Sequence, residues 1–310
     1  MSLTLKSLPP EWSSLYPFQP NYKTLSCGFA MNYLDEGKGH PVLMIHGNPT
    51  WSFFYRNAVL KLRDDFRCIV PDHIGCGLSD KPQKDYNFSL AQRISDLGEL
   101  VDSLELDSFD LVVHDWGGAI GIGVALQRLE RLRRIVILNT AAFADSRIPK
   151  RIAVCRWPIL GKLIVQGMNG FAGQAVKMAV HKRRLSSRVK SGFLYPYRTW
   201  NDRRAVYEFV KDIPMAKSHP SFGRLSEIEK GLPLLRNKPA ALIWGGKDFC
   251  FNDHFLRRWK RFLPHATEIR YPLAGHYLLE DETEKICDAI EQFVSFEDDG
   301  IPDTNLTNIS

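Results

Sequence analysis

Short apolar runs recur along this chain between amphipathic stretches, a pattern that predicts buried strands alternating with helices. Residues 41–47, 66–72 and 110–114 are dominated by apolar residues, as is typical of parallel strands covered on both faces. Strands that alternate with helices indicate an α/β fold with a mostly parallel central sheet and helices on both faces. The other predicted elements are strands at 24–34, 134–139, 239–245 and 267–271, and helices at 89–104, 119–129 and 282–293.

Residues 141–230 interrupt this alternation with helical candidates at 152–165 and 173–180. We therefore predict two parts: a core formed by residues 1–140 and 231–310, and a helical cap formed by residues 141–230. A chain of 310 residues with 44% hydrophobic and 25% charged residues is long and apolar enough to bury such a core.

The six cysteines are scattered, without a CxxC pair or a metal-type spacing. The N-terminal segment lacks the basic and apolar regions of a signal peptide, and no uninterrupted apolar run is long enough to span a bilayer. These features predict a cytoplasmic protein with free thiols, no bound metal and no cofactor.

Basic residues accumulate in the predicted cap. From Arg147 to Lys190 the chain contains no Asp or Glu, although its formal net charge is only +6. A solvated basic face is the ordinary interpretation of such a run. The apolar residues interleaved at 152–165 also permit a weak contact with an anionic membrane, an acidic partner or a second copy of the chain. No motif for nucleic-acid binding accompanies these charges, so nucleic acid is not an expected partner.

The run at 110–114 leads directly into Asp115, Trp116, Gly117 and Gly118. Strand, sharp turn and helix form a nucleophile elbow, in which one side chain stands above the edge of a parallel sheet. Glycines are needed there because a Cβ would not fit where the helix meets the strand. An aspartate in the elbow forms an ester with an electrophilic carbon, so the predicted reaction begins with displacement at carbon. The alternative is a structural Asp115 that caps a buried helix.

Ligands of parallel α/β sheets bind beyond the carboxyl ends of the strands, which directs attention to the residues after each run. Asp248 follows the run at 239–245, and His276 follows the run at 267–271. Alone, Asp248 could be a turn residue and His276 a core histidine. Together with Asp115 they stand in the order nucleophile, acid, base, so we predict these three residues to be catalytic.

Two neutral donors accompany the predicted triad. Asn48 follows the run at 41–47, and Trp116 follows Asp115 directly. Both are placed to contribute to an oxyanion hole. A turn before Pro49 would explain Asn48 structurally, and core packing would explain Trp116.

Several motifs resemble the haloalkane dehalogenase family of α/β-hydrolases, and the resemblance spans about residues 10–295. The motifs are His46-Gly47-Asn48-Pro49, residues 72–79 (DHIGCGLS), His114-Asp115-Trp116-Gly117-Gly118 and Gly275-His276. The details resemble the third subfamily and its relatives, the β-lactone decarboxylases of olefin biosynthesis. The resemblance implies an α/β-hydrolase fold in which the acid follows the strand after the cap, as Asp248 does. Asp145, near the strand before the cap, is the weaker alternative for the acid.

The resemblance implies a dehalogenase cycle. Asp115 displaces halide from carbon, and the halide leaves toward Asn48 and Trp116. His276, oriented by Asp248, then activates the water that hydrolyses the ester to an alcohol. The expected partners are a small apolar halogenated substrate and a halide ion, and the large assemblies of the third subfamily suggest a homo-oligomer.

Three alternatives stay open. A β-lactone decarboxylase would use the same five residues on a β-lactone and release an alkene and carbon dioxide. An epoxide hydrolase, which is less favoured, would need acidic cap hydroxyls, for which Tyr195, Tyr197 and Tyr207 are candidates. A non-catalytic binding protein on the same fold would be expected to lack a member of the triad. Whichever substrate is used, Phe143 is a candidate wall of the substrate pocket.

Overall fold

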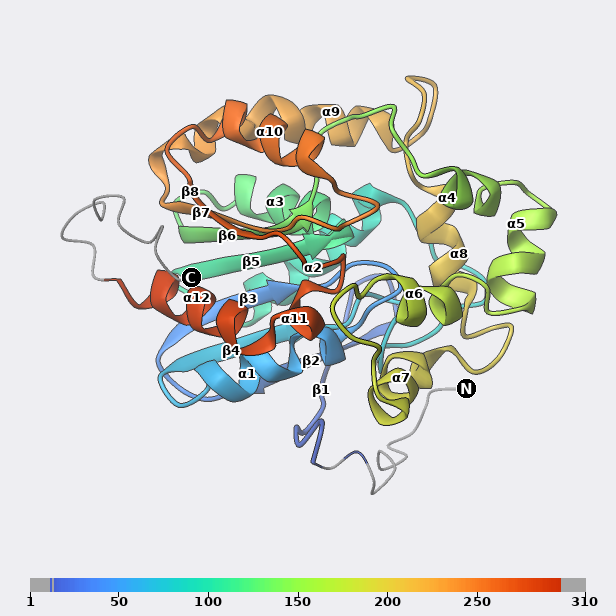
Figure 1. Cartoon of the computed structure of the whole chain (residues 1–310), viewed down its shortest axis with the longest axis horizontal. Helices are drawn as coiled ribbons and strands as arrows, with labels where there is room; N and C mark the ends of the chain where they lie inside the picture. Colours follow the sequence, from blue (N-terminus) through green and yellow to red (C-terminus); the bar gives the residue numbers. More distant parts are fainter. Residues whose placement is uncertain (1–11, 13, 297–310) are drawn as a thin grey trace.

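The structure is a computed structural model that describes residues 12 and 14–296; the ends of the predicted core at 1–11, 13 and 297–310 lie outside the described residues. Its centre is a sheet in which the described strands follow the order β1-β2-β4-β3-β5-β6-β7-β8 (Figure 1). Strand β2 pairs with β1 and β4 in antiparallel fashion, and all other neighbours are parallel, which confirms the predicted mostly parallel sheet. The strands are β1 (Asn21–Thr24), β2 (Ala30–Glu36), β3 (His40–Ile45), β4 (Phe66–Pro71), β5 (Phe109–Asp115), β6 (Leu132–Thr140), β7 (Ala240–Gly245) and β8 (Thr267–Tyr271).

Helices cover both faces of this sheet (Figure 1). Along β5, Leu111 and Val113 enter one apolar cluster and Val112 enters the other, because successive side chains of a strand point to opposite faces. Both faces are therefore dry, which explains why the central strands are continuously apolar. One face is covered by α1 (Arg56–Leu62) and α12 (Thr283–Ser295), and the other by α2 (Leu90–Ser103), α3 (Trp116–Leu126), α9 (Phe222–Gly231) and α10 (Asp253–Phe262).

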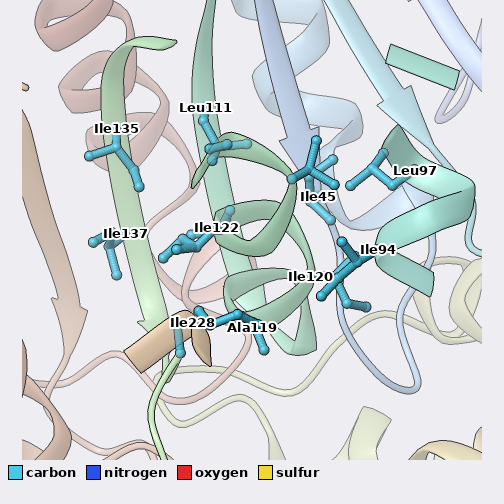
Figure 2. Packing of buried hydrophobic residues seen from close by; sticks show 14 of the residues in the cluster. Ile45, Ile94, Leu97, Leu111, Ala119, Ile120, Ile122, Ile135, Ile137 and Ile228 are labelled. Atoms are coloured by element: carbon cyan, nitrogen blue, oxygen red, sulfur yellow. The ribbon is translucent and has the colours of Figure 1, made fainter. Parts of the chain in front are cut away.

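Helix α3 is the most deeply buried of these helices, and its glycines let it lie close to the strands. Figure 2 shows Ile120 and Ile122 of α3 packed with Ile45 and Leu111 of the sheet and with Ile94 of α2. A helix fixed on this many sides is a rigid base for the residue at its N-terminus.

The segment between β6 and β7 supplies a group of helices at one end of the molecule (Figure 1). The prediction of one helix over 152–165 was wrong, because α4 ends at Cys155 and α5 begins only at Leu160. Pro158 lacks an N–H and its ring would clash with the carbonyl of Val154 in a continuous helix, so the chain turns there. The cap helices are α4 (Lys150–Cys155), α5 (Leu160–Lys162), η3 (Leu163–Gly167), α6 (Ala172–Met178), α7 (Ser187–Leu194), η4 (Tyr195–Tyr197) and α8 (Arg204–Lys211).

Helix α9 lies almost entirely within the range 141–230 predicted for the cap, but it packs on the sheet layer, where Leu225 and Ile228 join the cluster around α3. The remaining short elements are η2 (Ser52–Tyr55), η5 (Leu232–Asn237) and α11 (Leu278–Asp281). Across the described residues, no helix combines the length and the apolar character that crossing a bilayer would require.

Candidate active site

Strand β5 ends at Asp115, and α3 begins at the next residue. Asp115 has φ 52° and ψ −128°, a conformation that side chains other than glycine rarely adopt, as expected of a strained nucleophile elbow. A Cβ on Gly117 would overlap the carbonyl of Ile45, and one on Gly118 would overlap the Thr140 side chain. The two glycines therefore let the helix start close enough to the sheet to raise Asp115 above its edge.

The loop after β3 lies against the Asp115 carboxylate. The backbone N–H of Asn48 donates to Asp115 Oδ1 at 2.6 Å. A Cβ on Gly47 would overlap that carboxylate, so only glycine permits this approach. The Asn48 side chain donates from Nδ2 to the Val206 carbonyl at 3.2 Å, which leaves the second N–H of the amide available. The Asn48 backbone thus supplies one arm of an oxyanion hole.

His276 lies between two carboxylates. Its Nδ1 is 2.7 Å from Asp248 Oδ2, and its Nε2 is 3.5 Å from Asp115 Oδ2. The other oxygen of Asp248 accepts from the backbone N–H groups of Cys250 at 2.6 Å and Phe251 at 3.0 Å. These donors fix the orientation of Asp248, which in turn fixes the imidazole.

Burial opposes protonation of His276, but the attraction of Asp248 and the contacts with Asp115 outweigh it and raise the pKa of His276 to about 10. All three side chains are buried. The two carboxylates therefore favour the protonated form of the imidazole at neutral pH.

Two apolar cavities adjoin Asp115, with volumes of about 140 Å³ and about 410 Å³. The smaller contains Trp116 and the larger contains His276. Five residues line both cavities: Asn48, Asp115, Ile152, Phe171 and Cys250. The nucleophile therefore stands at the junction of two apolar lobes.

The structure brings together all five residues predicted for the site. Asn48, Asp115 and Trp116 line one lobe, and His276 and Asp248 connect to Asp115 through the contacts described above. Phe143, the predicted wall, lines the smaller lobe.

Asp145 lines the smaller lobe but is paired there with two basic side chains. It lies 2.8 Å from Arg258 and 2.7 Å from His254, so it takes the place of a structural ion-pair partner rather than of the acid beside His276. Asp248 is buried and contacts His276 directly, so it is the carboxylate in the position of the acid.

The cap tyrosines do not offer an acid to a substrate beside Asp115, contrary to the epoxide alternative. The hydroxyl of Tyr197 donates to the Thr50 carbonyl at 3.1 Å, and that of Tyr207 donates to the Pro158 carbonyl at 3.0 Å. Tyr195 packs edge-on against Trp12, and none of the three lines either lobe.

Three further residues at the junction of the lobes were not predicted from the sequence: Ile152, Phe171 and Cys250. Cys250 could have been predicted, because it lies two residues after Asp248 in the same loop at a strand end. Ile152 and Phe171 belong to the cap, where no strand end marks a residue as facing the site.

Residues 40–283 match a family model described as the alpha/beta hydrolase fold. The cis-3-alkyl-4-alkyloxetan-2-one decarboxylase of Shewanella oneidensis is 41% identical and covers 91% of this chain and 90% of its own. Haloalkane dehalogenase 2 of Mycobacterium tuberculosis is 35% identical, with 89% and 95% coverage. The chain belongs to the α/β-hydrolase family.

Within the α/β-hydrolase family, the two named relatives confirm the predicted kinship with haloalkane dehalogenases and with β-lactone decarboxylases, since an oxetan-2-one is a β-lactone. The crystal structure of haloalkane dehalogenase DbeA from Bradyrhizobium elkani has a TM-score of 0.80 at 23% identity and covers 89% of this chain and 97% of its own. This likeness confirms the fold. The chain is thus a hydrolase-fold enzyme related to haloalkane dehalogenases.

Proposed function

We propose that this enzyme decarboxylates cis-3,4-dialkyl β-lactones through a covalent ester of Asp115. The observation that carries the proposal is the pair of apolar lobes that share Asp115, one for each alkyl chain of such a substrate. A simple haloalkane has one chain and needs only one lobe. The relative from Shewanella oneidensis named for this activity supports the same choice.

The reaction needs no water. An oxygen of Asp115 attacks ring carbon C4, the bond from C4 to the ring oxygen breaks, and the ring oxygen keeps the electron pair as part of a carboxylate. Carbon dioxide then leaves from C3, and the electron pair of the broken C–C bond forms the alkene. The bond between C4 and Asp115 breaks in the same step and returns its electron pair to Asp115.

The neighbours of Asp115 suit both steps. The carboxylate released by ring opening would lie beside Asn48 and Trp116, whose N–H groups can donate hydrogen bonds to it and stabilise its negative charge. The His276 cation, 3.5 Å from Asp115, favours the return of negative charge to Asp115 in the second step.

Haloalkane dehalogenation is the second candidate. It is favoured by the neutral donors Asn48 and Trp116 at the nucleophile and by the dehalogenase relative from Mycobacterium tuberculosis. In this reaction the halide leaves with the electron pair of its bond to carbon. Because esterification removes the negative charge of Asp115, the imidazolium of His276 first releases its proton to solvent. The neutral imidazole then takes a proton from water, the resulting hydroxide attacks the ester carbonyl of Asp115, and the acyl C–O bond breaks. The alkoxide receives the proton back from His276 and leaves as an alcohol.

The two reactions differ in their use of water, so an isotope decides between them. We expect the enzyme to convert a cis-3,4-dialkyl β-lactone into alkene and carbon dioxide in H₂¹⁸O without incorporating ¹⁸O into the peptide that holds Asp115. Dehalogenation of 1,2-dibromoethane would instead label that peptide, because water attacks the Asp115 carbonyl. Alkene formation from the lactone, or halide release from 1,2-dibromoethane, that persists in Asp115→Asn would refute the covalent mechanism for that substrate.

His276→Phe gives a second test. Dehalogenation by this variant should stop at the ester, visible as added mass on the peptide that holds Asp115, because no base activates water. Decarboxylation should slow but continue past the ester. Halide release without alkene formation in the wild-type enzyme would reject the lactone in favour of the haloalkane.

A further inference from the structure

Large hydrophobic side chains are exposed mainly on the cap. Of the nine such side chains in the described part of the chain, six lie between residues 157 and 200. Ile159 is 79% exposed and Met168 is 70% exposed. Single exposed apolar residues are ordinary, but a cluster marks a binding surface. We call these six residues the cap patch: Trp157, Ile159, Leu160, Leu163, Met168 and Trp200.

Hydrogen bonds bring several members of the cap patch together. The N–H of Leu163 donates to the Ile159 carbonyl at 3.0 Å, and the N–H of Met168 donates to the Leu163 carbonyl at 3.0 Å. These helical turns put Ile159 and Leu163 on one face. The Gln166 side chain donates to the Trp200 carbonyl at 3.1 Å and brings Trp200 beside them. In Figure 1 the α5 turn lies at the outer edge of the cap.

The segment that carries the cap patch has charge of one sign. Residues 147–201 contain twelve Lys and Arg and no Asp or Glu, whereas the rest of the chain contains 29 basic and 35 acidic residues. All of the positive excess therefore belongs to the cap. Lys162 lies inside the patch with its Nζ 5.8 Å from the Trp200 ring. Among the described residues no carboxylate pairs with Lys162 or with Arg198, two positions before Trp200.

We propose that the cap patch docks on the surface of an anionic membrane. Tryptophan and aliphatic side chains surrounded by Lys and Arg combine insertion into the acyl boundary with attraction to lipid phosphates. The acid-free stretch suits a surface of uniform negative charge better than a partner protein, whose interface would offer both signs at defined positions.

The cap patch and the lining of the lobes belong to the same cap segment, so docking on a membrane would place the active site near lipophilic substrates. Ile152 of α4 lines both lobes, and Trp157 follows it by five residues in the same cap segment. A β-lactone with two alkyl chains partitions into a bilayer, so docking would bring the enzyme to its substrate. This use rests on the proposed function, whereas docking itself does not.

Vesicle co-sedimentation of the full chain without substrate tests the proposal. Wild type should bind phosphatidylcholine vesicles that contain phosphatidylglycerol, bind pure phosphatidylcholine much less, and lose binding as salt rises. Ile159→Ser/Leu163→Ser should weaken binding about tenfold or more, because two inserted aliphatic side chains are lost. Lys162→Glu should lose mainly the salt-sensitive part of the binding to anionic vesicles.

The matched control is Leu234→Ser/Leu273→Ser, which removes two side chains of 56% and 54% exposure away from the cap and should bind like wild type. Thermal melts of all variants establish that each is folded. Wild type that ignores anionic vesicles at low salt, or Ile159→Ser/Leu163→Ser that binds as well as wild type, would overturn the proposal. An oligomer in solution that this double variant dissociates would instead assign the patch to a second copy of the chain.

Discussion

At the scale of single residues, the charge of Asp115 controls the proton on His276. Asp248 and Asp115 together raise the pKa of His276 to about 10, against the effect of burial. When Asp115 becomes an ester its negative charge is lost, so part of this stabilisation of the imidazolium disappears. The imidazole is then closer to acting as a base, which is the role that ester hydrolysis requires. The covalent step itself thus prepares the general base.

Asp248→Asn should lower the pKa of His276 and reduce ester hydrolysis by roughly 10³–10⁴-fold. Because the pKa of His276 is raised in the folded protein, its contribution to stability is full below the unfolded value near 6.5 and is lost as the pH rises through about 10. The variant should therefore lose less stability than wild type between pH 7 and pH 10.5, measured by denaturant unfolding. Asp145→Asn is the control and should leave the pKa of His276 unchanged.

Gly47→Ala should displace the Asp115 carboxylate, because the added Cβ would overlap it. We expect a folded protein with turnover reduced by about 10²-fold, since small misplacements of a nucleophile have effects of this size. Gly223→Ala is the control, because nothing lies within 4 Å of its added Cβ on α9. Steady-state kinetics with equal losses in the two variants would contradict the assignment of Gly47.

The triad and the donors could be predicted from the sequence because each residue directly follows a strand or belongs to a recognisable motif. Asp115 is an example. The apolar run before it and the two glycines that follow Trp116 are the pattern of a nucleophile elbow, which few other structures share. The junction residues Ile152 and Phe171 could not be predicted, because their place in the site depends on how the cap folds back over the sheet.

At the scale of elements, the cap and the loop of His276 are joined by one buried carboxylate. Asp281 at the end of α11 accepts from the backbone N–H groups of His181 at 2.8 Å, Lys182 at 2.9 Å and Gly275 at 2.7 Å. The N–H of Tyr277 also donates to the Ala179 carbonyl at 2.7 Å. The segment after α6 therefore holds the residues on both sides of the general base.

Asp281→Asn should destabilise the protein by about 1–3 kcal/mol, because at least one buried N–H loses its acceptor. Hydrogen exchange should accelerate at residues 179–182 and 275–277 together, and kcat should fall about tenfold as His276 loses its fixed position. Glu282→Gln is the control: it removes only the partner of the exposed Lys182 and should change stability by less than about 0.5 kcal/mol. Faster exchange at 179–182 alone would show that the two segments are not coupled.

The strands were predictable and the cap helices were not, for a physical reason. A strand buried on both faces must be apolar throughout, so β5 and β7 are recognisable without their neighbours. The cap helices are short and carry many basic residues, and a single proline, Pro158, ends the predicted long helix.

At the scale of the whole molecule, a buried ion pair connects the cap to the core. Arg93 of α2 lies 3.7 Å from Asp212 at the end of α8, and its guanidinium stacks over Phe209 at 3.6 Å. Asp212 also accepts from Ser221, just before α9. Because α8 and α2 share this contact, cap and core should unfold together.

Asp212→Ala should lower the free energy of unfolding by about 3–5 kcal/mol, because it leaves the buried charge of Arg93 without its partner. Calorimetry should still show one transition, at a lower Tm. Glu227→Gln, which removes an exposed partner of Arg224, should melt like wild type. Two separate transitions in the wild-type protein would contradict a shared unfolding unit.

The uneven distribution of charge between residues 147–201 and the rest of the chain has a consequence before any contact is made. A molecule whose cationic end and anionic end are separated has a permanent dipole moment, and a negatively charged surface exerts a torque on it. Diffusing enzyme would turn its cap forward as it approaches, within about 10 Å at ordinary ionic strength. A larger share of encounters would then be productive.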